Sequence, residues 1–325
     1  MNPYYLVAVA GTHGKTTTTA MLTDIFESAE KDPTAVIGSL RAKTQSNYRP
    51  GKSKYAIAEA CEYKRDFLHL QPDILVITNI ELDHVDYYKS LEDVQDAFRT
   101  MIWKVSDNGF VVCNPKDPNV AAVLNETDVT IVDYTEMLDP LLSLKQPGLH
   151  NKLNAAAAIA TAMQEKINRN DASQTLTEFA GTWRRYQYKG EINSVPVYDD
   201  YAHHPTAIKM TINATRELYP DKRIVAVFKP HTYSRTAALF DDFAKSFTGA
   251  DQALFLPIYG AREENVTGVS SRELAVKTIA YVPDAQYFDS HESLEAYLRS
   301  HLTPGEVLVV MGAGDVTLVA NSLTA

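Results

Sequence analysis

The sequence has little of several features that would mark a special environment or partner. Its two cysteines, Cys61 and Cys113, form no metal-like spacing and favour a reducing compartment. Lys and Arg number 31 against 41 acidic residues, and the net charge of −10 argues against broad binding to nucleic acid or anionic membranes. No apolar run approaches the roughly 20 residues of a membrane span, and the first residues lack a basic start and an apolar core. We therefore expect a cytoplasmic protein that binds no membrane and no nucleic acid.

What is present is an ordinary globular composition, 45% hydrophobic and 22% charged, in a chain of 325 residues. That length leaves room for two domains with separate cores. The sequence contains no internal repeat and no low-complexity segment, and it leaves the oligomeric state open.

The most specific stretch lies near the start, where an apolar run at residues 5–10 breaks into glycines and then into a helix-competent segment. Gly11 and Gly14 allow backbone angles that turn several N–H groups toward one anion, and the following helix adds its positive end. Lys15 would reach the β- and γ-phosphates, and the Thr16 hydroxyl would bind the Mg²⁺ that bridges them. The pattern predicts ATP binding. Val9 stands where the strict motif has its first glycine, so a glycine turn that merely ends in Lys-Thr is the alternative.

The first half alternates apolar runs with helix-competent stretches. Continuous rather than alternating apolarity predicts strands buried on both faces of a mostly parallel sheet, and the fold class is a doubly wound α/β domain. The expected strands are residues 34–37, 55–58, 74–77 and 110–113, and the expected helices include residues 16–28 and 91–105.

Two of these strands are followed by acids. Ligands of open α/β sheets bind beyond the carboxyl ends of the strands, which places Glu59 and the Asp83-His84 pair near the phosphates. Glu59 is the best candidate for a carboxylate ligand to Mg²⁺. For Glu62, Asp83 and Asp86, helix caps and solvated loop charges are as good an explanation as a catalytic role. A surface loop is the alternative for His84.

A polar segment at residues 148–154 leads into an alanine-rich stretch, residues 155–163, that predicts a helix. Asn151 or Asn154 could cap this helix. A cap accounts for one asparagine but not for His150, Asn151 and Asn154 together, so we predict that these residues face the nucleotide.

The second half predicts another α/β sheet, with strands at residues 195–198, 223–228, 252–256 and 307–310. We place the domain boundary by pattern near Thr182, which gives domains at residues 1–182 and 183–325. The loops after these strands, at residues 199–205, 229–235, 259–264 and 311–315, are charged and rich in histidine, as expected for half of an active site. The glycines at 312 and 314 could form an anion-binding nest or a tight turn.

Eight motifs in order along the chain resemble those of the Mur ligases, the ATP-dependent amide-bond formers of peptidoglycan assembly. They lie at residues 11–17, 59–63, 78–84, 148–154, 184–187, 199–205, 230–236 and 311–315. The resemblance is strongest to the alanine-adding branch, and it implies a P-loop mononucleotide-binding domain followed by a Rossmann-like ligase domain. Several relatives carry a carbamylated lysine where residues 98–101 have none.

The resemblance also implies roles for individual residues. Lys15 would hold the β- and γ-phosphates, and Mg²⁺ would be bound by Thr16, Glu59 and His84. The catalytic set would be Lys15, Glu59, His84, Arg185, Asp199 or Asp200, His203 and Arg235. Arg185 matches a catalytic-site arginine, and the last three match loops that the C-terminal domain closes over ATP and the amino acid. The nucleotide set would be Gly11, Thr12, His13, Gly14, Lys15, Thr16, Thr17, His150, Asn151 and Asn154.

The implied reaction phosphorylates the lactyl carboxylate of UDP-N-acetylmuramate with ATP, and L-alanine then displaces the phosphate. His203 or one of the two aspartates is expected to take the ammonium proton. Family members carry a UDP-binding domain before the phosphate loop, which here begins at Gly11, so we expect that domain to be missing and activity to be weak. A ligase that adds a peptide or another amino acid, a folylpolyglutamate-type ligase, and a non-catalytic ATP-binding module are the alternatives.

Overall fold

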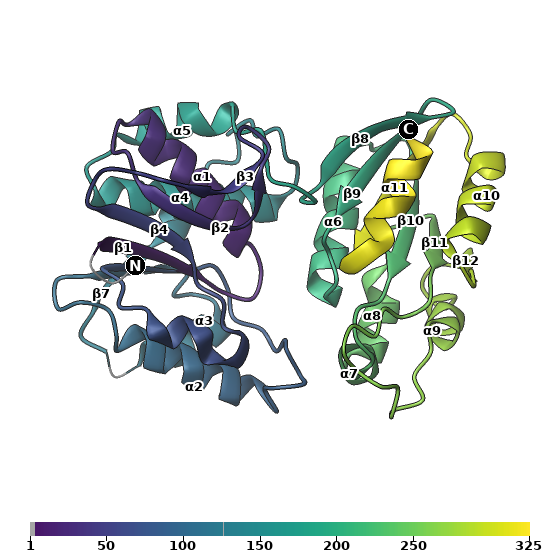
Figure 1. Cartoon of the computed structure of the whole chain (residues 1–325), viewed down its shortest axis with the longest axis horizontal. Coiled ribbons are helices and arrows are strands. Elements are labelled where there is room, and N and C mark those ends of the chain that lie inside the picture. Colours follow the sequence, from purple (N-terminus) through teal and green to yellow (C-terminus); the bar gives the residue numbers. More distant parts are fainter. Residues whose placement is uncertain (1–3, 126) are drawn as a thin grey trace. The chain divides into compact units, whose positions relative to one another are not determined.

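The computed structural model describes residues 4–125 and 127–325, and the chain divides into two compact units after Trp183. Each unit is a layered α/β structure with its own sheet (Figure 1). Among the described residues, no helix is both long and apolar enough to cross a bilayer.

The sheet of the first unit has the order β3-β2-β4-β1-β5-β6-β7 in the described part of the chain. All its pairs are parallel except β2 with β3. Val9 aligns with Glu59 and Ala10 with Ile77, so the carboxyl ends of β1, β4 and β5 meet at one edge. The strands are β1 (Tyr5–Ala10), β2 (Thr34–Arg41), β3 (Ser46–Arg49), β4 (Tyr55–Glu59), β5 (Ile74–Ile77), β6 (Phe110–Cys113) and β7 (Thr130–Asp133).

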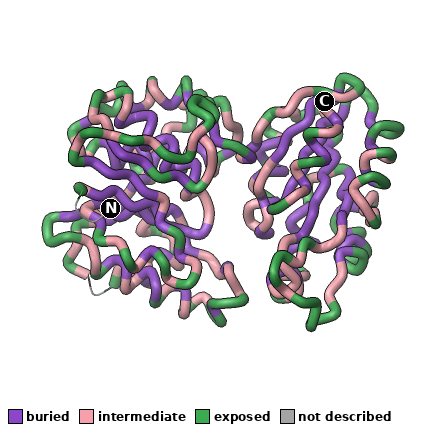
Figure 2. The backbone as a smooth tube through the Cα atoms, viewed as in Figure 1, coloured by how far each residue is buried: buried purple, intermediate pink, exposed green. Residues whose placement is uncertain are grey.

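Helices cover both faces of this sheet, and the strands between them are buried (Figures 1 and 2). One face carries α1 (Lys15–Ser28), α4 (Leu149–Gln164) and α5 (Arg169–Thr177). The other carries α2 (Leu91–Ile102), α3 (Pro118–Leu124) and the 3₁₀ segment η1 (Tyr63–His69), while η2 (Tyr134–Met137) packs against α4. The doubly wound α/β class predicted from the sequence is confirmed.

The second unit contains a sheet of order β12-β11-β10-β13-β9-β8, parallel except for β8 with β9. Its strands are β8 (Gln187–Ile192), β9 (Val195–Asp200), β10 (Arg223–Lys229), β11 (Gln252–Phe255), β12 (Ala285–Tyr287) and β13 (Glu306–Gly312). Apolar clusters on its two faces include residues of α6 (Pro205–Leu218), α8 (Phe240–Ser246) and α9 (Ser271–Thr278) on one side, and of α10 (His291–His301) and α11 (Thr317–Leu323) on the other. The short α7 (Tyr233–Ala238) and η3 (Gly314–Val316) follow β10 and β13.

Candidate functional site

The phosphate loop connects β1 directly to α1. Gly11 and Gly14 have φ of +129° and +85°, values that disfavour any residue with a Cβ. A Cβ on Gly11 would lie 2.0 Å from Oγ1 of Thr78, so the space is closed as well. Gly14 caps α1 without a side-chain hydrogen bond, which leaves the first N–H groups of the helix without a capping side chain. Helix starts of this kind bind anions, and Thr17 lies buried in the same first turn.

The loop is held in place by the segment that follows β5. The His13 N–H donates to Oδ1 of Asn79 over 2.9 Å, and the Thr12 N–H donates to the Asn79 carbonyl over 3.1 Å. The Thr78 hydroxyl donates to the His13 carbonyl over 2.6 Å. These bonds fix the loop before any ligand arrives.

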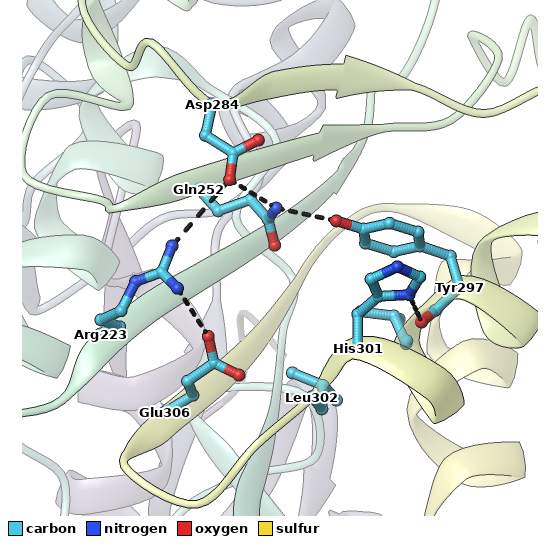
Figure 3. A pocket seen from close by; sticks show the side chains of 8 residues that line it. Arg223, Gln252, Asp284, Tyr297, His301, Leu302 and Glu306 are labelled. Atoms are coloured by element: carbon cyan, nitrogen blue, oxygen red, sulfur yellow. Dashed lines mark hydrogen bonds and ion pairs between the residues drawn. The ribbon is translucent and has the colours of Figure 1, made fainter.

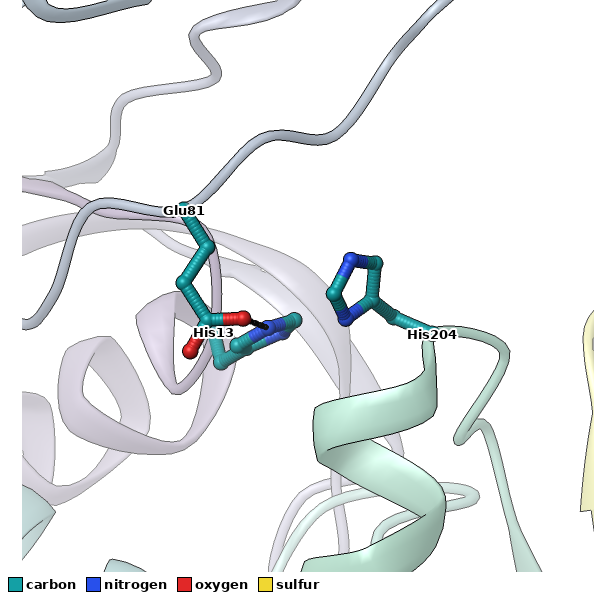
Figure 4. A group of neighbouring side chains, drawn as sticks. All are labelled: His13, Glu81 and His204. Carbon is teal, nitrogen blue, oxygen red and sulfur yellow. Dashed lines mark hydrogen bonds and ion pairs between the residues drawn. The ribbon is translucent and has the colours of Figure 1, made fainter. Parts of the chain in front are cut away.

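Glu81 braces the loop from the same segment. Its Oε2 lies 3.3 Å from Nε2 of His13 (Figure 4), and its N–H donates to the Thr12 hydroxyl over 2.8 Å. Glu81 was not predicted as a site residue, although its place in the strand-end motif at residues 78–84 was a usable signal.

Lys15 is folded back over the loop. Its ammonium donates to the carbonyls of Gly11 and Thr12 and lies 2.8 Å from the Glu62 carboxylate. Burial alone would lower the pKa of Lys15, but the charge and hydrogen bond of Glu62 outweigh it and the pKa is raised. Glu62 is itself only 3% exposed, so the ion pair is shielded from water.

The residues predicted to bind Mg²⁺ fit that ion in part. The Thr16 hydroxyl donates to Oε1 of Glu59 over 3.1 Å, and the Gly38 N–H donates to the other carboxylate oxygen over 2.7 Å. A hydroxyl and a carboxylate this close supply the hard oxygen ligands that Mg²⁺ prefers. His84 has φ of +51°, and its Nε2 lies 3.8 Å from the Glu62 carboxylate, its ring beside Tyr63 at 4.7 Å between centroids.

The asparagines of the 148–154 motif do not cap the helix as the sequence suggested. Gly148, with φ of +96°, turns the chain so that α4 begins at Leu149 and both asparagines lie within it. The Asn151 amide donates to the Pro147 carbonyl over 2.8 Å, and the Asn154 amide donates to Asn151 over 3.4 Å. The side-chain oxygen of Asn154 packs against the phosphate loop, because Oδ1 fills the place where a Cβ of Gly14 would be.

His150 sits beside these asparagines in the first turn of α4. Burial, with a smaller contribution from nearby His13, lowers the pKa of its imidazole to about 4. The neutral ring can therefore donate and accept a hydrogen bond at physiological pH.

In the second unit the carboxyl ends of β9, β13 and β10 are neighbours, with Met311 aligned to Asp200 and Gly312 to Lys229. The two aspartates that end β9 differ sharply. Asp199 is fully buried, pairs with Nε of Arg184 at 3.2 Å and accepts from the Thr317 hydroxyl at 2.6 Å. These contacts favour a structural role for Asp199.

Asp200 lies at the very end of β9 and accepts from two backbone N–H groups, those of Tyr186 and Ala202, both over 2.7 Å. Burial raises the pKa of its carboxyl to about 6, although Arg185 and these two hydrogen bonds act in the opposite direction. A carboxyl that ionises near neutrality is suited to proton transfer.

The other predicted residues of this unit gather around one tyrosine and one histidine. The guanidinium of Arg185 lies 5.2 Å from the ring centre of Tyr201, whose carbonyl is 2.8 Å from Nδ1 of His203. The ring of His203 is 6.0 Å from that of His231, which is 3.2 Å from Nη1 of the buried Arg235.

Several other side chains of the second unit have partners that the sequence did not indicate. The ammonium of Lys229, the last residue of β10, lies 2.6 Å from Asp315 and 3.2 Å from Nε2 of His291. His204 caps α6, because its Nδ1 accepts from the Thr206 N–H over 3.3 Å. The carbonyls of Gly312 and Gly314 accept from Arg184, which favours a turn held by that arginine over an anion-binding nest.

A separate hollow of about 180 Å³ lies at the opposite, amino-terminal edge of the same sheet (Figure 3). Arg223 and Glu306, the first residues of β10 and β13, pair there at 3.2 Å. The Gln252 amide donates to Asp284 over 2.7 Å and to the Tyr297 hydroxyl over 3.1 Å. The polar side chains that line the hollow are thus largely paired with one another. The lining residues are Arg223, Gln252, Asp284, Tyr297, Leu298, His301, Leu302 and Glu306.

Comparison with known families gives two matches that together cover most of the chain. Residues 9–137 match the Mur ligase middle domain, and residues 184–314 match the Mur ligase, glutamate ligase domain.

Individual relatives match over nearly the whole chain. The UDP-N-acetylmuramate–L-alanine ligase of Clostridium acetobutylicum is 39% identical over 96% of this chain and 74% of its own. The crystal structure of the UDP-N-acetylmuramate-alanine ligase of Thermotoga maritima superposes with a TM-score of 0.79 at 25% identity, covering 98% of this chain and 74% of that one. A murein peptide ligase of Psychrobacter arcticus gives 0.71 at 25% identity, covering 99% and 77%.

Proposed function

This chain belongs to the Mur ligase family, and from that membership we propose that it joins L-alanine to the lactyl carboxylate of UDP-N-acetylmuramate at the expense of ATP. The observation that carries the proposal is the 39% identity to a UDP-N-acetylmuramate–L-alanine ligase over 96% of the chain. The phosphate loop and the acidic strand ends give this similarity a chemical basis.

The first unit would bind ATP. The open N–H groups at the start of α1 and the Lys15 ammonium would balance the phosphate charge. Asn154 lies against Gly14, so the amides of α4 and the neutral His150 supply hydrogen bonds to the nucleotide beside the same loop.

Thr16 and Glu59 would hold Mg²⁺, with His84 as a further ligand. When bound, the ion supplies positive charge that screens the phosphates during transfer.

The proposed reaction has two steps. An oxygen of the lactyl carboxylate attacks the γ-phosphorus and ADP leaves, which gives an acyl phosphate. The amine of L-alanine then attacks the acyl carbon, forms the amide bond and displaces phosphate. The ammonium of L-alanine must first lose a proton, and the pKa of about 6 makes Asp200 the preferred candidate for the base, with His203 as the alternative. Arg185 and Arg235 would offset negative charge on the reacting groups.

A second candidate is a ligase that attaches a peptide to the same sugar. The superposition on a murein peptide ligase at 25% identity favours it, although its acceptor is larger than a single amino acid. The two candidates share every step except the identity of the amine.

The acceptor experiment separates them. The protein is incubated with ATP, Mg²⁺, UDP-N-acetylmuramate and either L-alanine, the corresponding tripeptide or L-glutamate, and phosphate release and the mass of the product are measured. The 325-residue chain is tested alone and with the UDP-binding domain of a relative added in trans. We expect an amide with L-alanine only. Amide formation with the tripeptide would favour the second candidate, and ATP binding without any amide would favour a non-catalytic module.

A further inference from the structure

We propose that Glu62 is a positioning residue that holds the ammonium of Lys15 in the phosphate loop and makes ATP binding depend on a divalent cation. The inference deepens the proposed function and rests on it, because it takes the phosphates of ATP as the ligand of the loop.

The first step concerns the three protons of the Lys15 ammonium. They are directed at the carbonyls of Gly11 and Thr12 and at the carboxylate of Glu62, which lies at 2.8 Å and 3.0 Å through its two oxygens. An ammonium has three donors and no more, so a phosphate oxygen can bind Lys15 only by displacing one of these acceptors. The two carbonyls belong to the loop itself. Glu62 is the anion that a phosphate would replace.

The second step concerns what remains when Lys15 moves. The backbone of Glu62 is held in place, because its carbonyl accepts from the buried Tyr88 hydroxyl at 2.6 Å and from the Arg65 N–H at 2.8 Å. Glu62 is 3% exposed, so its carboxylate is shielded from solvent at this position. A buried carboxylate that loses its cation is strongly destabilising.

A cation that enters with ATP would remove this penalty. The carboxylate of Glu62 lies 3.8 Å from Nε2 of His84, one of the proposed Mg²⁺ ligands. Lys15, the partner of Glu62, is the first residue of α1, and Thr16, another proposed ligand, follows it. Metal-free ATP would draw Lys15 away and strand the carboxylate, whereas ATP with Mg²⁺ brings a compensating charge to the same side of the loop. Glu62 thereby couples the binding of ATP to the binding of Mg²⁺.

The test compares ATP dissociation constants with Mg²⁺ and with a chelator, by calorimetry, in the unmodified chain and in Glu62→Gln. Removing the charge should strengthen metal-free ATP binding by roughly 10-fold and shrink the gain from Mg²⁺ by about the same factor. A purely structural role would weaken both measurements together, so the opposite signs are the diagnostic result.

Two further variants complete the experiment. Asp66→Asn removes an equal charge from the exposed part of the η1 segment that follows Glu62, and it should change neither constant by more than about two-fold. Glu62→Asp keeps the charge and should retain the dependence on Mg²⁺, and it serves if Glu62→Gln folds poorly.

The outcomes are distinguishable. Two results would overturn the role of Glu62 alone. In the first, the ATP dissociation constants of Glu62→Gln with Mg²⁺ and with the chelator change equally or in the same direction. In the second, Glu62→Asp loses the dependence on Mg²⁺ while the protein stays folded. If the unmodified chain binds no ATP under either condition, the proposed function fails and the inference falls with it.

Discussion

Gly14 and Asn154 meet so closely that a Cβ on the glycine would lie 2.3 Å from Oδ1 of the asparagine. The contact joins the phosphate loop to α4, two segments that are far apart in the sequence. It gives Asn154, which lies inside the helix rather than at its cap, a contact with the loop, and it makes the shape of the loop depend on α4.

The first prediction is that Gly14→Ala destabilises the first unit and abolishes ATP binding. The φ of +85° disfavours alanine by about 1–2 kcal/mol, and the clash with Asn154 adds roughly 1–3 kcal/mol. Chemical denaturation and ATP titration measure the two effects.

Gly268→Ala is the matched control for the backbone contribution. Gly268 has φ of +72°, but a Cβ there would meet nothing within 4 Å. We expect the free energy of unfolding to fall by about 1–2 kcal/mol, the cost of backbone strain alone, and ATP binding to be unchanged. An equal loss at both glycines would contradict the importance of the contact with Asn154.

Lys15→Ala is predicted to affect stability as well as binding. The substitution removes the phosphate-binding ammonium and also leaves Glu62 as a buried carboxylate without its lysine partner, at a cost of roughly 3 kcal/mol. The double variant Lys15→Ala/Glu62→Gln should regain most of that stability while binding of Mg²⁺-ATP stays lost. Full stability in Lys15→Ala would show that the ion pair contributes little to the fold.

The sequence predicts the sheets well where strands are buried on both faces. The apolar runs at residues 55–58, 74–77 and 110–113 all form central strands because their pattern reports burial directly. The edge strands β3, β7, β8 and β12 were missed, because they are short or only partly buried and lack that pattern.

The site was less predictable than the sheets. Strand ends located Glu59, whose contact with Thr16 follows from the meeting of β1 and β4. The pairing of Glu62 with Lys15 could not be anticipated, because it depends on an irregular segment in which Lys64 and Arg65 both have positive φ. Single-sequence patterns carry no signal for such backbone geometry.

The third prediction concerns His150, whose imidazole should titrate near pH 4 in NMR spectra, with His150→Gln used to assign its signals. Between about pH 4 and 6.5 the folded protein then binds fewer protons at this position than the unfolded chain. The stability from this lowered pKa is fully present above pH 6.5 and is lost as the pH falls toward 4. A titration near 6.5 would contradict a ring kept neutral by its surroundings.

The fourth prediction concerns Asp200, whose carboxyl pKa is raised to about 6. The folded protein binds more protons here than the unfolded chain between the ordinary aspartate pKa of 3.8 and about 6, so this contribution to stability falls as the pH rises through that window. If Asp200 is the base, kcat/KM for ligation should rise as the pH passes about 6. Asp200→Asn should lose that limb of the profile and keep its fold. An unchanged profile would transfer the role to His203.

The last prediction separates Asp199 from its neighbour. Asp199 and Arg184 are 0% and 2% exposed, and Arg184 also donates to the carbonyls of Gly312 and Gly314. Asp199→Asn keeps the shape but leaves the buried guanidinium without its counter-charge, which should lower the free energy of unfolding by roughly 3 kcal/mol. Denaturation of the variant at neutral pH measures this loss.

The matched control is an ion pair of similar length on the surface. Arg272 and Asp289 lie 3.0 Å apart with side chains that are 65% and 80% exposed, and Asp289→Asn should cost less than about 1 kcal/mol because water screens the pair. A large loss of stability in Asp199→Asn with a small one in Asp289→Asn would show that Asp199 serves to stabilise the fold. Comparable small losses would mean that the carbonyls of Gly312 and Gly314 satisfy Arg184 by themselves, and Asp199 would return as a candidate base beside Asp200.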